Sequence, residues 1–263
     1  MKYLNPKRYY RRAAKIVYET ILHDAREIEL AEHAKFDALG LDAKAALGRL
    51  NEILREVNGR GFDFQNDSIH WLLFAALSLK LPGVKRILEL GTFDGEFTHI
   101  LARLFPSAEI VTIDLPEGDP LLRDLYDRKD DADYLAYKKK RADRLQRPNV
   151  KTIEVNSFFL LDRIQGSFDL IWVDAGHLYP EVAWDTANAY HLCKPGGWML
   201  CDDIIPSKKF YKDAYVSTEA WEVLQYLAER TPVLMTLFLK RRLPELYRKW
   251  QTRKYVAAVN KLA

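Results

Sequence analysis

Short apolar runs alternate with helical stretches from residue 86 onward, and no other pattern in the chain limits its fold so strongly. The runs span residues 86–90, 109–113, 150–155, 168–173 and 198–201. Strands separated by helices require crossover connections, which give a parallel sheet covered by helices on both faces. A final strand is expected at 255–259. The predicted fold class is therefore α/β, a doubly wound sheet that is mostly parallel with an antiparallel last strand.

The residues before this alternation have helical periodicity instead. Apolar side chains recur at helical spacing over 43–57 and again over 69–77. We therefore divide the chain into a helical N-terminal extension, residues 1–65, which forms a lid or a dimer element, and a main domain, residues 66–263. Beyond Asp203 the pattern predicts a helix at 217–230, an apolar run at 233–239 and a short helix near 244–250.

The charge of the chain is unevenly distributed. The 263 residues include 40 Lys and Arg against 37 Asp and Glu, a formal net charge of +3. Residues 1–15 and 239–263 are strongly basic, so the body between them is acidic. Aromatic residues accompany the basic ends, and such segments can contact an anionic membrane surface, a nucleic acid or a phosphorylated substrate. Lys138 to Arg141 lie near several aspartates, a mixture typical of a solvated helix face.

Composition excludes several classes of protein. With 48% hydrophobic residues the chain can form a sizeable core, and its two cysteines, Cys193 and Cys201, cannot supply a disulfide framework. The longest strictly apolar run, 71–77, is far shorter than the roughly 20 residues that cross a bilayer. The polar N-terminus lacks the apolar stretch of a signal peptide. We expect a cytoplasmic protein without a transmembrane segment.

A glycine turn follows the first strand of the alternating region. Gly91 and Gly95 differ from the dinucleotide fingerprint because Phe93 stands where the middle glycine would be, and its side chain would crowd a pyrophosphate. Asp114 ends the second strand, where an acid can accept hydrogen bonds from ribose hydroxyls. A nucleoside without a pyrophosphate fits this pattern better than a dinucleotide does.

Ordered motifs across residues 66–205 resemble those of class I S-adenosylmethionine-dependent methyltransferases, which have a Rossmann-like fold. These motifs are Glu89-x-Gly91-x-x-x-Gly95, then Asp114, then 168–174, then Lys194-Pro195-Gly196-Gly197. The resemblance implies that the cofactor is S-adenosylmethionine, with the glycine turn along its methionine part, Asp114 at the ribose and Asn156 with Ser157 at the adenine. The implied cofactor-binding residues are Glu89, Gly91, Thr92, Phe93, Asp94, Gly95, Asp114, Asn156, Ser157 and Asp174.

Three carboxylates follow the fourth and fifth strands. If these strands are neighbours, Asp174 lies about one strand spacing, 4.8 Å, from Asp202 and Asp203. Carboxylates this close tolerate each other when a cation lies among them, and an all-oxygen set favours Mg²⁺. The layout is similar to that of metal-dependent O-methyltransferases of the catechol and macrocin type. The predicted metal ligands are Asp174, Asp202 and Asp203; the alternative is that Asp202 and Asp203 cap a helix without metal.

His177 is the predicted general base, with Asp174 as the second catalytic residue. Imidazole titrates near neutral pH, so it can take the proton of an acceptor hydroxyl. The alternative is that His177 caps the following helix or touches the cofactor. Asp185, on that helix, is expected to be an exposed or capping acid.

The predicted function is transfer of a methyl group from S-adenosylmethionine to a hydroxyl on a small molecule or glycan, assisted by Mg²⁺. Two alternatives stay open: an RNA methyltransferase, favoured by the basic ends, and a non-catalytic cofactor-binding or scaffold protein of the same fold. The resemblance leaves the acceptor unnamed, and the extension leaves room for a homo-oligomer.

Overall fold

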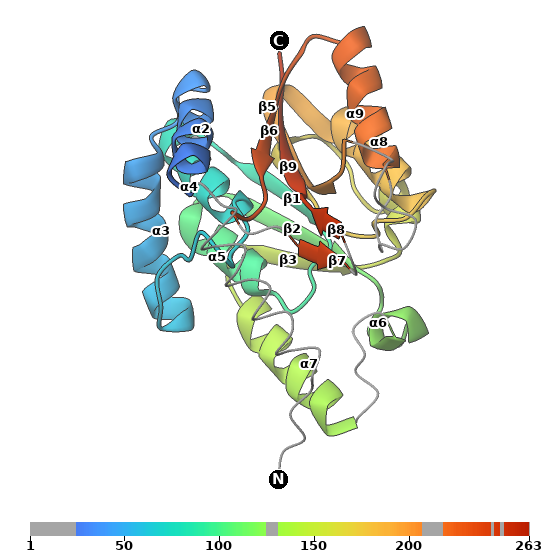
Figure 1. The fold of residues 1–263 in the computed structure, drawn as a ribbon. Helices are drawn as coiled ribbons and strands as arrows, with labels where there is room; N and C mark the ends of the chain where they lie inside the picture. The colour runs from blue at the N-terminus through green and yellow to red at the C-terminus, as the bar shows by residue number, and fades with distance from the viewer. Residues whose placement is uncertain (1–24, 125–130, 207–217, 243–244, 248–249, 263) are drawn as a thin grey trace.

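The computed structural model describes residues 25–124, 131–206, 218–242, 245–247 and 250–262 (Figure 1). The helices are α2 (Ala25–Ala38), α3 (Ala43–Asn58), α4 (His70–Lys80), α5 (Glu96–Leu104), α6 (Pro120–Asp124), α7 (Asp131–Leu145), α8 (Glu181–Leu192) and α9 (Glu219–Arg230), with the 3₁₀ helix η2 (Ser157–Asp162). The strands are β1 (Arg86–Leu90), β2 (Glu109–Asp114), β3 (Val150–Glu154), β4 (Phe168–Val173), β5 (Cys193–Ile204), β6 (Val233–Leu239), β7 (Glu245–Tyr247), β8 (Trp250–Thr252) and β9 (Tyr255–Lys261).

The main sheet has the order β3-β2-β1-β4-β5-β9-β6. Strands β1 to β5 pair in parallel, and β9 pairs antiparallel with both β5 and β6. The chain reverses its strand order at β1 and β4, which is where doubly wound sheets open a ligand crevice at the carboxyl ends of their strands. The predicted fold class, a mostly parallel Rossmann-like sheet with an antiparallel last strand, is confirmed.

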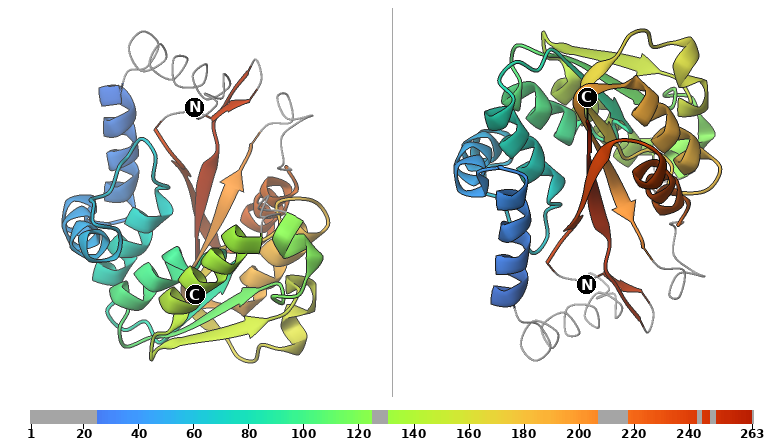
Figure 2. Two further views of the ribbon diagram at one scale, coloured as in Figure 1. Left: turned by 90° about the horizontal axis from the view of Figure 1, so that it is seen from below. Right: turned by 90° about the horizontal axis from the view of Figure 1, so that it is seen from above.

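Helices cover both faces of the sheet (Figure 2), and alternating residues of the central strands contribute to two separate cores, one on each face. Ile87 faces the layer formed by α2 to α5, and its neighbour Leu88 faces the layer with α8 and α9. Both side chains are fully buried. Because the sheet is covered on both faces, its central strands are almost continuously apolar, as parallel strands generally are.

The described part of the N-terminal extension packs directly on the sheet. Asp42 caps α3 by accepting a hydrogen bond from the backbone of Ala45. Phe36 of α2 and Leu50 of α3 belong to the same core as Trp172 of β4. Helix α2 also meets the edge strand, since Glu32 accepts a hydrogen bond from the Leu239 N–H at 3.0 Å. These contacts place the extension beside the end of β6.

The short helix expected near 244–250 is wrong, because β7 and β8 pair there as an antiparallel two-stranded sheet. Tyr, Trp and Thr favour strands, and that preference outweighed the helical spacing of the apolar residues. None of the described helices is long and apolar enough to cross a membrane.

Candidate active site

The glycine turn joins three strands at the carboxyl edge of the sheet. Gly91 has φ +95°, and a Cβ at this position would lie 2.1 Å from the carbonyl oxygen of Asp174. The Gly91 N–H donates to the Ile113 carbonyl at 2.8 Å, and the Asp174 N–H donates to the Leu90 carbonyl at 2.8 Å. No side chain can be accommodated at position 91, so the turn after β1 packs directly against the backbone that follows β4.

Phe93 holds a strained backbone conformation within this turn. Its φ of +49° lies in the left-handed region, which a bulky residue rarely adopts. Its N–H donates to Asp114 Oδ2 at 2.9 Å and its carbonyl accepts from the Tyr137 hydroxyl at 2.8 Å. Its ring stays 43% exposed. Strain of this kind persists where surrounding contacts fix it, and it concentrates at ligand sites.

Asp114 lies at the end of β2, beside the turn, as predicted. Besides the Phe93 N–H, its carboxylate accepts a hydrogen bond from the Leu115 N–H at 2.8 Å. Burial raises the pKa of Asp114, although the charge of Arg141 and backbone hydrogen bonds act against that rise. The carboxylate is thus held at the edge where the resemblance places the ribose.

Glu89 and Thr92 lie beneath the turn and not along an open groove. Glu89 is 1% exposed, and its Oε2 accepts hydrogen bonds from Thr98 and Thr112 at 2.5 Å each. Burial raises the pKa of Glu89 to about 8. Thr92 Oγ1 lies 2.6 Å from Thr112 Oγ1. Both residues therefore support the turn from inside, and direct contact of either with the cofactor stays a prediction.

Helix α7 packs over the turn, a contact that its charge pattern does not indicate. Arg144 forms an ion pair with Asp94 at 2.5 Å, and Arg141, only 4% exposed, lies 3.4 Å from Asp114. The interpretation of 138–141 as a solvated face is therefore wrong for Arg141. Tyr137, Arg141 and Arg144 recur at helical spacing on one face, a signal that could have revealed their shared direction.

The predicted adenine edge lies at the start of η2. Asn156 caps η2, its side-chain oxygen accepting from the Phe158 N–H at 2.9 Å. The Ser157 hydroxyl donates to Asp185 at 3.1 Å. Trp184 of α8 stacks on Phe158, with ring centroids 5.0 Å apart, and its indole N–H donates to the Phe158 carbonyl. Both rings are partly exposed, so an aromatic surface borders this edge.

Asp185 is fully buried, so the expectation of an exposed or capping acid is wrong. Burial raises the pKa of Asp185 to about 7. The residue faces the core because it shares a helix face with Val182 and Ala189, which are also buried. Its hydrogen bond from Ser157 links α8 to the adenine edge.

Asp174, which follows β4, comes together with Asp202 and Asp203, which lie at the end of β5 and not after it. Val173 pairs with Cys201, so Asp174 and Asp202 follow neighbouring positions of parallel strands. His177 Nε2 lies 3.4 Å from Asp174 Oδ1 and 3.8 Å from Asp203 Oδ2. Burial alone would lower the pKa of His177, but Asp174 and the other carboxylates outweigh it and raise that pKa. Asp203 has φ +52°, a second strained position at this edge.

Two lysines occupy the acidic cluster. Lys240 Nζ donates to Asp202 Oδ2 and Asp203 Oδ1, each at 2.5 Å, and Lys254 Nζ donates to Asp203 Oδ2 at 2.7 Å. Burial would raise the pKa of Asp203, but Lys240, His177 and Lys254 hold it well below its usual range. The pKa of Lys240 is raised, since the two aspartates outweigh the opposing effect of burial.

These contacts do not fit the predicted magnesium ion. Mg²⁺ requires oxygen ligands in near-octahedral geometry, whereas the facing oxygens of Asp202 and Asp203 already accept hydrogen bonds from an ammonium group. Among the described side chains, no group of His, Cys, Asp and Glu is arranged to hold a metal ion. The lysines belong to the basic C-terminal segment, so part of the positive charge of that segment is buried in ion pairs inside the molecule. The basic residues 1–15 lie outside the described part of the chain.

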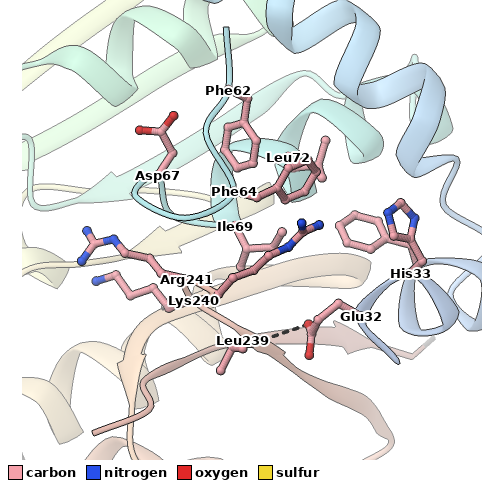
Figure 3. Close-up of a pocket in the computed structure, with 12 residues that line it drawn as sticks. Glu32, His33, Phe62, Phe64, Asp67, Ile69, Leu72, Leu239, Lys240 and Arg241 are labelled. Carbon is pink, nitrogen blue, oxygen red and sulfur yellow. Dashed lines mark hydrogen bonds between the residues drawn. The ribbon is translucent and has the colours of Figure 1, made fainter. Parts of the chain in front are cut away.

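A small cavity adjoins the lysine that reaches the cluster (Figure 3). Its volume is about 20 Å³, enough for roughly one water molecule. Phe62 and Phe64 line one side, and Lys240 and Arg241 line the other. The Arg242 guanidinium stacks over the Phe64 ring at 3.9 Å. The cavity therefore lies between the segment after α3 and the end of β6.

Comparison with known proteins agrees with this arrangement. Residues 88–204 match a protein family described as a methyltransferase domain. The chain is 31% identical over 156 residues to the O-methyltransferase hkm8 of Aspergillus hancockii, a match that covers 59% of this chain and 54% of that protein. The chain thus spans about half the length of the curated relative that it matches.

Solved structures share the fold at low sequence identity. The O-methyltransferase TomG from Streptomyces achromogenes, crystallised with S-adenosylmethionine, is 19% identical with a TM-score of 0.50, covering 92% of this chain and 100% of that one. A candidate O-methyltransferase from Klebsiella pneumoniae is 18% identical with the same TM-score and coverage. The match over residues 88–204 and the shared fold show that this part of the chain is similar to methyltransferase domains.

Proposed function

We propose that this protein binds S-adenosylmethionine at the glycine turn and transfers its methyl group to a hydroxyl of a small molecule or glycan. The observation that carries the proposal is the position of His177. It contacts Asp174, and Asp174 is the residue whose backbone packs against Gly91. A candidate base is therefore fixed directly beside the turn that the cofactor would contact.

The residues at the turn fit the cofactor. Gly91 lets β1 and the segment after β4 pack backbone to backbone at the edge where the cofactor would bind, and Asp114 offers carboxylate oxygens at the ribose position. Asn156 and Ser157, next to the stacked rings of Phe158 and Trp184, would face the adenine. The presence of S-adenosylmethionine in the TomG crystals supports this assignment. When bound, the cofactor supplies a methyl group activated by its sulfonium charge.

The chain's own contribution is to hold the acceptor and take its proton. Because Nε2 faces Asp174, His177 would accept the proton of the hydroxyl at its other ring nitrogen, Nδ1, as the methyl carbon exchanges its bond to sulfur for a bond to the acceptor oxygen, a step worth roughly 10²–10⁴-fold. Asp174 would orient the imidazole and stabilise its charged form, since it lies 3.4 Å away. Holding the acceptor oxygen in line with the transferred methyl group accounts for the rest of the rate enhancement. The curated relative's name, an O-methyltransferase, supports oxygen as the acceptor atom.

We also propose that the segment after α3 is the lid over the acceptor. It contributes Phe62 and Phe64 to the cavity whose opposite wall includes Lys240. The cavity is too small for an acceptor as it stands. Movement of this segment would widen it next to the acidic cluster.

Calorimetric titration with S-adenosylmethionine and with S-adenosylhomocysteine tests the cofactor assignment. We expect both to bind, and a Gly91→Val variant that still folds to bind neither. Transfer of a labelled methyl group to a panel of phenols, sugars and oligoribonucleotides then tests the acceptor class. Absence of cofactor binding would refute the proposal, and methylation confined to the oligoribonucleotides would replace the acceptor.

A further inference from the structure

The acidic cluster is closed by residues from a distant part of the chain. Lys240 follows β6 and Lys254 precedes β9, and the antiparallel pairing of these strands brings both to the carboxyl end of β5. The side chains of Lys240 and Lys254 are only 11% and 10% exposed, and those of Asp202 and Asp203 are 2% and 8% exposed. Burying a charge costs several kcal/mol for each ion, so each of these buried charges needs an oppositely charged partner close by.

We propose that Lys240 and Lys254 replace the divalent cation in this site, so that the protein holds its acidic cluster without a metal ion. Two ammonium groups carry the same charge as one Mg²⁺. Lys240 contacts Asp202 and Asp203, Lys254 contacts Asp203, and Asp174 lies beside His177. Replacement of the cation by the lysines does not depend on the reaction, whereas the effect of the lysines on catalysis rests on the proposed function.

The geometry favours replacement over coexistence. Lys240 Nζ lies between one oxygen of Asp202 and one of Asp203, and Lys254 takes the other oxygen of Asp203. Both oxygens of Asp203 are therefore committed to ammonium groups. A metal ion between Asp202 and Asp203 would have to displace Lys240 and leave a buried ammonium without its partners, which costs more than a surface ion pair gains.

Lys240 and Lys254 would act as positioning residues for the reaction. By holding both oxygens of Asp203 they fix its carboxylate 3.8 Å from His177 Nε2. Asp203 also keeps a left-handed backbone with φ +52°, which needs such support to persist. In this arrangement the lysines orient the base through Asp203 without touching the acceptor.

Binding of Mn²⁺, followed by electron paramagnetic resonance and calorimetry, tests the proposal without cofactor or acceptor. We expect no binding of Mn²⁺ by the wild type at millimolar concentration. A Lys240→Ala/Lys254→Ala variant should bind Mn²⁺ at least about tenfold more tightly than the wild type does. Lys261→Ala is the matched control, because Lys261 contacts the Tyr190 ring and donates to the backbone carbonyls of Tyr190 and Cys193, away from the acidic cluster. This control should bind Mn²⁺ no better than the wild type.

Thermal unfolding gives a second measurement, which can be made even if the double variant is only weakly stable. Mn²⁺ should raise the melting temperature of the double variant and leave that of the wild type unchanged, because a ligand stabilises only the state that binds it. Binding of Mn²⁺ by the wild type in competition with Mg²⁺ would overturn the proposal. A folded double variant indifferent to Mn²⁺ would overturn it too. Neither result depends on whether S-adenosylmethionine binds, so failure of the proposed function is a separate outcome.

Discussion

Gly91 and Asp174 meet backbone to backbone, so that a Cβ at position 91 would lie 2.1 Å from the carbonyl oxygen of Asp174. One residue belongs to the cofactor turn and the other contacts the candidate base His177. The contact therefore links the two halves of the candidate site through main-chain atoms, which are stiffer than side chains. A disturbance at Gly91 should reach both cofactor binding and the position of His177.

Gly91→Ala should destabilise the fold by about 2–4 kcal/mol, since it adds strain at a positive φ to a clash with backbone. Urea unfolding measures the loss, and calorimetry measures the accompanying loss of S-adenosylmethionine binding. Gly118→Ala is the control, because a Cβ there meets nothing within 4 Å. Equal stability of the two variants would contradict the close approach seen at Gly91.

The buried carboxyl of Glu89 should make stability depend on pH. Its pKa is about 8 in the folded protein against an ordinary 4.5, so the folded state retains a proton that the unfolded chain releases between these values. Stabilisation from Glu89 is therefore complete below about pH 4.5 and is lost as pH rises to about 8, at up to about 1.4 kcal/mol per pH unit.

Glu89→Gln removes this titration and should flatten the dependence. Urea unfolding at several pH values between about 5 and 8 compares the variant with the wild type. The exposed Glu52, changed to Gln, serves as the control and should leave the slope intact. Parallel stability curves for wild type and Glu89→Gln would show that Glu89 does not retain its proton.

Asp114→Ala should weaken S-adenosylmethionine binding about tenfold to a hundredfold, because a hydrogen bond to a charged group contributes about 1.5–3 kcal/mol. The loss should be measured by calorimetry alongside Asp143→Ala, which removes an exposed acid of α7. An unchanged affinity of the Asp114→Ala variant for S-adenosylmethionine would show that the ribose does not bind at this carboxylate.

His177→Gln should lower kcat about 10²–10⁴-fold while leaving the cofactor's Kd within about a factor of two. The exposed His191, changed to Gln, is the matched control and should keep full activity. Single-turnover transfer of a labelled methyl group provides the rate. If both variants turn over at the wild-type rate, the proton leaves by another route.

Much of the sheet could be predicted from sequence because its signals are local. Each parallel strand is a short apolar run followed by a turn, and the ordered runs place Asp174 and Asp202 at neighbouring strand ends, as the pairing of Val173 with Cys201 confirms. The glycine turn is equally local, since Gly91 and Gly95 have the positive φ values that their residue type permits.

The lysines of the acidic cluster could not be predicted in this way. Periodicity indicates that 233–239 and 255–259 form strands, but it does not say that β9 lies between β5 and β6. Lys240 follows Asp202 by 38 positions, so their contact depends on that placement. Three carboxylates this close indicated that a cation lies among them. The chain supplies the positive charge through Lys240, which belongs to the C-terminal segment whose basic residues had suggested contact with an external partner.

Strand β9 comes near the end of the described chain, yet it lies inside the sheet. During synthesis, β5 and β6 would therefore emerge with unpaired edges, and Asp203 would emerge before Lys254 exists to neutralise it. Non-local pairing of this kind is slow because its loop entropy is lost before the contacts form. A nascent chain that ends before residue 255 should be an open intermediate with exposed strand edges, and a target for chaperones.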